Sequence, residues 1–197
     1  MKNIKNLEVY KKCLIIVDMV YGFVREGVLH DEAIAHIIPR QIELIEEYKK
    51  NEELVMLIKD THNLDSVEFR RFGEIPHCLK DTAESQLVDE LKPYEKDDNV
   101  ITIEKNSTSF MEAPQFREVI GKLINVERFD INGCCTDICV FNGPMALANY
   151  LDQWNRKAQV YVHTDAGATY NEENRKNYVD AAILLMEQQG IQLVKKK

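Results

Sequence analysis

Residues 13–17 read Cys-Leu-Ile-Ile-Val, a continuous apolar run with the length of one β-strand. Runs of this kind are typical of parallel sheets covered on both faces, because every side chain is then buried. The pattern recurs at Leu54–Ile58 and Val100–Ile103, and apolar residues at helical spacing predict a helix over Ala33–Lys50. The first half of the chain therefore alternates strands with helices or irregular segments.

The same alternation continues to the end of the chain. Further strands are predicted at Arg128–Asn132, Gln159–His163 and Ile191–Val194, and further helices at Ala83–Leu91, Pro114–Leu123, Ile138–Leu151 and Glu172–Gln189. This order predicts an α/β fold with a mostly parallel, doubly wound sheet. No repeat or low-complexity linker interrupts the pattern, so we expect residues 1–197 to form a single domain.

Composition restricts the partners and the compartment. The net charge of −8 argues against nucleic acid and against an anionic membrane, since both require a basic surface. The opening residues 1–12 are polar and charged, so no signal peptide is predicted, and the five cysteines form an odd, irregular set. We therefore expect a cytoplasmic protein with reduced thiols that binds neither nucleic acid nor membrane.

The tetrad Thr136-Asp-Ile-Cys139 lies where a predicted strand and Gly133 give way to a predicted helix. Unpaired backbone N–H groups and the positive end of the helix dipole at such a junction stabilise a thiolate. This position suits a nucleophile. The alternative is that Cys139 is a small buried apolar residue, the usual fate of a free cysteine.

Two further reactive side chains follow predicted strands at the same edge of the sheet. Asp18 comes directly after the first strand and Lys105 just after the third, and doubly wound sheets bind ligands beyond these carboxyl ends. A carboxylate can take the proton of a thiol, and an ammonium favours both anions. Alone, Asp18 is equally a turn or helix cap and Lys105 a surface lysine. With Cys139 they indicate nucleophilic attack on a carbonyl carbon, with backbone N–H groups holding the oxyanion.

These residues and their neighbours resemble the isochorismatase-like cysteine hydrolase superfamily, and most closely its nicotinamidase-type amidases. The matching pieces are Ile16-Val-Asp-Met19 with Gly22-Phe23, Glu104-Lys105 ahead of Phe110, Gly133-Cys-Cys-Thr-Asp-Ile-Cys-Val140 and Val162-His-Thr-Asp-Ala166. They span nearly the whole chain in the order and spacing of the family. The resemblance implies a Rossmann-like α/β fold, doubly wound, with six parallel strands and helices on both faces.

The resemblance also implies roles for individual residues. Asp18, Lys105 and Cys139 would form a catalytic triad, and a cis peptide just before Cys135 would turn the amides of Cys135 and Cys139 into an oxyanion hole. Cys134 would adjoin the substrate through the same backbone geometry. Cys139 would then attack a carboxamide, ammonia would leave, and water would hydrolyse the thioester with Asp18 as acid and base. The vinyl-ether hydrolases of the family commonly lack the nucleophilic cysteine, so Cys139 favours amide over vinyl-ether chemistry. The resemblance to nicotinamidases makes conversion of nicotinamide to nicotinate the leading reaction.

A metal site is predicted after the second strand. Asp60 and His62 point the same way in an extended chain, so with His77 they can bind zinc, iron or manganese. From the spacing alone, solvated histidines are the alternative. The resemblance implies a divalent metal, with zinc favoured, and a glutamate as a further ligand. Glu68 is the first candidate for that ligand and Glu74 the second.

The substrate pocket is where the chain departs from the family. Nicotinamidases often carry Gln-Asn-Asp-Phe after the triad aspartate, whereas this chain has Val20-Tyr-Gly-Phe23. Phe23 is expected to stack on the substrate ring, with core packing as the alternative, and Tyr21 is a lesser candidate. An aromatic residue that commonly precedes the metal-binding histidine is absent at its position, and Phe72 would replace it only with a shift of the loop.

Other functions remain open from the sequence. One alternative is a related amidase that acts on a carbamoyl or ureido compound. Another is a catalytically silent protein of the same fold that only binds a ligand. A thiol redox protein is disfavoured, because adjacent cysteines form strained disulfides. By analogy with the fold family we expect a homo-oligomer.

Overall fold

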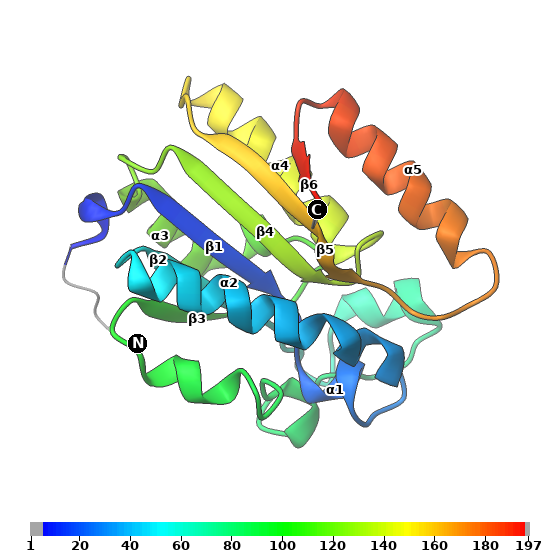
Figure 1. Ribbon diagram of the computed structural model, residues 1–197. Coiled ribbons are helices and arrows are strands. Elements are labelled where there is room, and N and C mark those ends of the chain that lie inside the picture. The colour runs from blue at the N-terminus through cyan, green and yellow to red at the C-terminus, as the bar shows by residue number, and fades with distance from the viewer. Residues whose placement is uncertain (1–5, 196–197) are drawn as a thin grey trace.

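The architecture is a six-stranded, all-parallel sheet with helices on both faces, seen in a computed structural model that describes residues 6–195 (Figure 1). The strands are β1 (Lys12–Val17), β2 (Leu54–Asp60), β3 (Val100–Lys105), β4 (Arg128–Cys134), β5 (Gln159–Ala168) and β6 (Gln192–Val194). Their order in the sheet is β3-β2-β1-β4-β5-β6. The winding direction therefore reverses between β1 and β4, at the centre of the sheet.

Helices cover the two faces in separate sets. The α-helices are α1 (Tyr21–Val24), α2 (Ile38–Lys50), α3 (Pro114–Lys122), α4 (Cys139–Gln153) and α5 (Arg175–Gln188). Side chains of α3, α4 and α5 pack with one set of alternating strand residues, and those of α1 and α2 pack with the other. All seven residues of β2 are buried, as expected for a strand covered on both sides. Among the described residues, no helix is long and apolar enough to cross a membrane.

The sequence-based prediction of strands and parallel pairing is confirmed, although β2, β3 and β4 each end two residues later than predicted and β5 ends later still. β5 continues five residues beyond the predicted end at His163, to Ala168, and its pairing with β4 shifts in register between Ile131 and Gly133. Beyond the shift, Cys134 pairs with Ala168. The extension brings the chain after β5 to the same edge as the chain after β4.

The predicted helix over Ala83–Leu91 is wrong. Only a 3₁₀ turn forms, at Ala83–Ser85, and the backbone that follows bonds to the segment after β1. Gln86 O accepts from Tyr21 N at 2.9 Å, and Val88 N donates to Met19 O at 3.1 Å. The apolar residues that suggested a helix are buried, but they are held by a neighbouring segment of chain instead of by helical hydrogen bonds.

Two predicted helices begin later than the apolar pattern suggested. The segment before α2 forms a 3₁₀ helix at Glu32–Ile37, and the α-helix follows from Ile38 with a proline in its first turn. α5 begins at Arg175, after Asn174 with a positive φ of 67°. Residues 169–174 therefore form a loop at the carboxyl edge of the sheet.

β1 and β4 approach very closely at Gly133. This glycine has a φ of 123°, and a Cβ placed on it would lie 2.1 Å from Val17 O. No other residue fits there without moving one of the two strands. The close approach sets the turn after β4 directly beside Asp18, the residue that follows β1.

Candidate active site

Asp18, Lys105 and Cys139 come together at the carboxyl edge of the sheet, where the winding direction reverses. Lys105 Nζ lies 2.8 Å from Asp18 Oδ2 and 3.6 Å from Cys139 Sγ. The same ammonium lies 2.6 Å from Asp60 Oδ1. All four side chains are buried. One buried cation is thus shared by two carboxylates and a thiol.

Burial and the shared cation determine the protonation of this group. Burial raises the pKa of Asp18 to about 7, although the Lys105 ammonium opposes the shift. For Asp60, burial is outweighed by Lys105 and by hydrogen bonds from two histidines, so the pKa lies well below its usual range. Burial also raises the pKa of the Cys139 thiol, with Lys105 opposing. At neutral pH the thiol therefore keeps its proton and needs a base, and Asp18 titrates in the range where it can act as one.

The turn between β4 and α4 presents free backbone donors. The peptide bond between Cys134 and Cys135 is cis, as the family resemblance implied. Ile138 N and Val140 N both donate to Cys135 O, whereas the amides of Cys135 and Cys139 make no hydrogen bond to another described residue. Since Cys139 is the first residue of α4, its N–H is one of the donors that a helix leaves unpaired. Two such donors can stabilise an oxyanion.

A cluster of ligating atoms adjoins the triad. One atom from each of Asp60, His62 and His77 lies within 4.8 Å of the others, and all three residues are buried. His62 Nε2 is 2.8 Å from Asp60 Oδ2, and His77 Nε2 is 3.5 Å from the same oxygen. Glu68 Oε2 lies 3.3 Å from His62 Nε2. Glu74, the second candidate for a carboxylate ligand, is exposed and outside this cluster.

The hydrogen bonds around the histidines fit this cluster to a cation. His62 Nδ1 faces Asn106 Oδ1 at 2.6 Å and His77 Nδ1 faces the Ile75 carbonyl at 2.8 Å, and both partners only accept. Each Nδ1 therefore donates, and Nε2 is the nitrogen that faces Asp60, where it donates to the carboxylate when protonated and can ligate a cation when it is not. Glu68 Oε2 is buried and has no hydrogen-bond donor among the described residues. Carboxylate oxygens and imidazole nitrogens that converge on one point, with each Nδ1 held by a second partner, suit a divalent metal.

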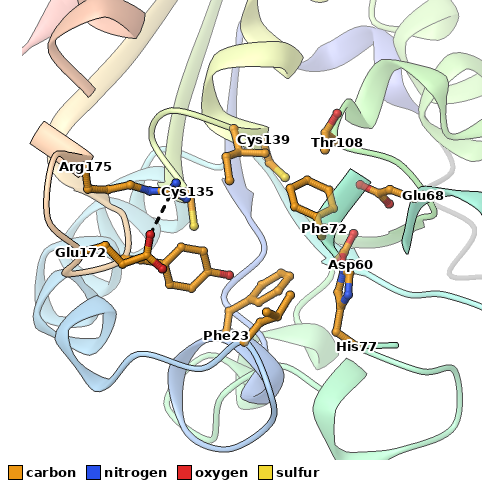
Figure 2. A pocket seen from close by; sticks show the side chains of 13 residues that line it. Phe23, Asp60, Glu68, Phe72, His77, Thr108, Cys135, Cys139, Glu172 and Arg175 are labelled. Carbon is orange, nitrogen blue, oxygen red and sulfur yellow. Dashed lines mark ion pairs between the residues drawn. The ribbon is translucent and has the colours of Figure 1, made fainter. Parts of the chain in front are cut away.

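A cavity of about 230 Å³ opens onto both groups (Figure 2). Of the site residues that the sequence suggested, those that line the cavity are Phe23, Asp60, Glu68, His77, Cys135 and Cys139. Asp18, Lys105 and His62 lie behind this lining. The Phe23 ring centroid is 5.9 Å from that of His77, so the aromatic side chain forms a wall beside the proposed metal ligands.

Two predicted substrate contacts lie elsewhere. Tyr21 Oη donates to Asp89 Oδ2 at 2.7 Å, and its side chain does not line the cavity. Cys134 is fully buried, and its thiol donates to Asp18 O at 3.1 Å. Cys134 therefore faces the backbone beneath the site, and its neighbour Cys135 is the residue that reaches the cavity.

Most of the other residues that line the cavity were not predicted from the sequence. The missed residues are Leu29, Thr108, Ile138, Tyr170, Glu172 and Arg175. Phe72, which was expected to reach the pocket only after a loop shift, also lines it, with its ring centroid 6.2 Å from that of His77. These residues come from loops and helix ends and are brought together only by the fold.

Comparison with known proteins agrees with this geometry. The model of the isochorismatase domain family matches residues 12–196. An uncharacterized isochorismatase family protein of Bacillus subtilis, PncA, is 30% identical over 83% of this chain and 89% of its own length. Nicotinamidase 1 of Arabidopsis thaliana is 30% identical over 66% of this chain and 57% of its own length. A crystal structure of the pyrazinamidase of Pyrococcus horikoshii in complex with zinc superposes with a TM-score of 0.73 at 26% identity, covering 94% of this chain and 99% of that one. The chain therefore belongs to the isochorismatase family.

Proposed function

We propose that this protein hydrolyses the carboxamide of a small molecule through a thioester on Cys139, with nicotinamide as the leading substrate. The family and the nicotinamidase relatives make it a hydrolase that acts on non-peptide C–N bonds. The observation that supports the cysteine mechanism is the placement of Cys139 Sγ. It lies 3.6 Å from Lys105 Nζ and also faces the cavity, so a substrate carbonyl can reach it.

In the first half of the proposed reaction, Asp18 accepts the thiol proton as Cys139 Sγ attacks the carbonyl carbon. Lys105 stabilises the carboxylate and the developing thiolate. The negative charge on the carbonyl oxygen is held by the N–H groups of Cys135 and Cys139. The C–N bond then breaks, Asp18 returns the proton to the leaving nitrogen, and ammonia departs from a thioester.

In the second half, water completes the reaction. Asp18 removes a proton from water, which attacks the thioester carbon in the same oxyanion hole. The C–S bond breaks, the thiol of Cys139 regains its proton, and the acid leaves. The sum is amide plus water giving carboxylic acid plus ammonia. A pKa of about 7 for Asp18 suits a group that gives and takes a proton in turn.

The ligand cluster supports a divalent metal, and zinc is the proposed ion because the pyrazinamidase of P. horikoshii contains zinc. Asp60, His62 and His77 would hold it, with Glu68 as a fourth ligand. A bound ion would supply a Lewis-acid site on the cavity wall, able to hold the ring nitrogen of a pyridine substrate. Lys105 links this cluster to the triad through Asp60.

Ammonia release from a panel of carboxamides tests the proposal. Metal-loaded protein is expected to release ammonia from nicotinamide or from another small amide in the panel, including carbamoyl and ureido compounds. Cys139→Ala should show no turnover, while its circular dichroism and Tm stay close to those of the wild type. Cys13→Ala, which removes a buried thiol remote from the cavity, is the matched control and should retain activity. Ammonia release by folded Cys139→Ala would refute the thioester mechanism.

A further inference from the structure

The cavity has a second charged end, formed by residues that the proposed reaction does not use. Figure 2 shows Arg175 and Glu172 at the end of the cavity opposite Asp60, Glu68 and His77, with Cys139 between the two ends. Among the described residues that line the cavity, Arg175 is the one arginine or lysine. The positive charge of Lys105 is already shared by Asp18 and Asp60.

The Arg175 guanidinium is anchored from one side. Its Nε lies 3.1 Å from Asp137 Oδ2 and donates to Thr169 Oγ1 at 3.3 Å. Thr169 in turn donates to Asp137 Oδ1 at 2.6 Å. The Asp137 side chain is only 4% exposed, so this anchor is fixed in the turn that precedes Cys139. Anchoring through Nε orients the guanidinium and leaves its outer edge for another partner.

That outer edge has no firm partner among the described residues. Its Nη1 forms an ion pair with Glu172 Oε2 at 3.9 Å, which is too long for a hydrogen bond. The Glu172 side chain is 65% exposed, and an exposed ion pair of this kind is weak. An oriented guanidinium with a free edge is the side chain best suited to bind a carboxylate through two parallel hydrogen bonds.

Arg175 also gives the substrate a preferred direction. It attracts a negative group at its end of the cavity, and Cys139 lies between that end and the proposed metal ligands. From these contacts we infer that the substrate carries, besides the carboxamide, an anionic group that binds to Arg175 and displaces Glu172. This inference rests on the proposed amidase function and replaces nicotinamide, which has no anionic group, with a small amide or ureide that carries a carboxylate. Arg175 is then a specificity residue. Before the substrate binds, the carboxylate of Glu172 lies where the anionic group of the substrate would bind.

The test compares matched substrates on matched variants. Succinamate and glutaramate, each a carboxylate with one amide, are compared with their neutral methyl esters. In the wild type kcat/KM should favour the charged member of each pair. Arg175→Met should reduce that preference roughly 10- to 100-fold, the usual worth of a charge-assisted hydrogen bond. Glu172→Gln should raise it, because the competing carboxylate is gone. Arg117→Met is the control, since Arg117 pairs with the exposed Glu112 and does not line the cavity.

The ratio separates specificity from a structural role of Arg175. If Arg175 only holds Asp137 in place, its replacement lowers kcat/KM for charged and neutral amides alike, and an unchanged ratio overturns the inference. Arg175→Lys, which keeps the charge but loses the planar edge, should give an intermediate ratio.

Binding decides the question independently of turnover. Calorimetry with succinate and glutarate should show weaker binding to Arg175→Met than to wild type, whether or not amides are hydrolysed. Equal affinity in both proteins, or no binding to wild type, overturns the inference. Failure of the amidase proposal would instead appear as absence of ammonia from every amide, charged or neutral.

Discussion

Replacing Lys105 by methionine is expected to destabilise the protein strongly, because Lys105 neutralises two buried carboxylates. Its ammonium is fully buried and lies 2.8 Å from Asp18 and 2.6 Å from Asp60. Removing one partner of a buried ion pair costs about 3–5 kcal/mol, because the other charge is left without compensation. For a chain of this length that loss corresponds to a decrease in Tm of roughly 6–20 °C.

The loss of stability should grow with pH. In the wild type the pKa of Asp18 is about 7, and removal of the ammonium raises that pKa further. Above pH 7 the folded variant then keeps a proton that folded wild type and both unfolded chains release. A carboxyl whose pKa is raised by folding loses stability as pH rises, so the difference between the two proteins should increase by up to about 1.4 kcal/mol per pH unit.

Urea unfolding of metal-depleted protein, followed by circular dichroism at pH 6 and pH 9, measures both effects. Asp18→Asn in the Lys105→Met background removes the titrating carboxyl and should abolish the extra loss at pH 9. Lys122→Met, which breaks a pair exposed by more than half on both sides, should cost less than about 0.5 kcal/mol. A loss below about 1 kcal/mol for Lys105→Met, or a loss independent of pH, would refute the argument that one buried cation holds this group together.

Three further results are expected. The rate of amide hydrolysis should rise through a pH of about 7, because burial raises the pKa of Asp18 to about 7 and the base must be ionised; an acid limb near pH 4 in the pH–rate profile would contradict this role. Elemental analysis should find about one divalent metal per chain, and His62→Ala should lose it, because that substitution removes one of the three clustered ligands; full metal content in the variant would refute the site. Gly143→Ala should cost about 1–3 kcal/mol in urea unfolding, because the added Cβ would lie 2.1 Å from Phe110 Cε1. Gly121→Ala, with nothing within 4 Å, is its control and should not destabilise.

The sheet could be predicted because each central strand is specified locally. An apolar run such as residues 13–17 is buried on both faces whatever its neighbours are, so pattern and structure agree. The segment Ala83–Leu91 shows where this reasoning fails. Its apolar residues have helical spacing, yet Val88 N bonds to Met19 O, a partner more than sixty residues away that no local pattern reveals.

The candidate site likewise contains residues that the sequence could place and residues that it could not. Asp18, Lys105 and Cys139 could be placed together from the sequence, because each follows or ends a parallel strand and such ends share one edge of the sheet. Arg175 could not be placed there. It begins a helix after a loop, and it reaches the cavity because β5 runs longer than its apolar pattern and redirects the chain. The positions of side chains on loops depend on where the strands end. The register shift beside Gly133, which helps to set the end of β5, is not visible in the sequence.

The contact between Gly133 and Val17 has a mechanical consequence for how such a protein can diversify. Because no side chain separates β1 from β4 at this point, a displacement of one strand also displaces the other. Asp18, which follows β1, and Cys139, which follows β4, therefore move together. The loop that leads to Arg175 is bonded through Asp137 to the turn before Cys139, so the separation between Asp18 and Cys139 is insulated only from the other segments that line the cavity, such as those of Leu29, Phe72 and Thr108. Those segments can change in length and charge to admit new substrates while the reacting atoms keep their spacing.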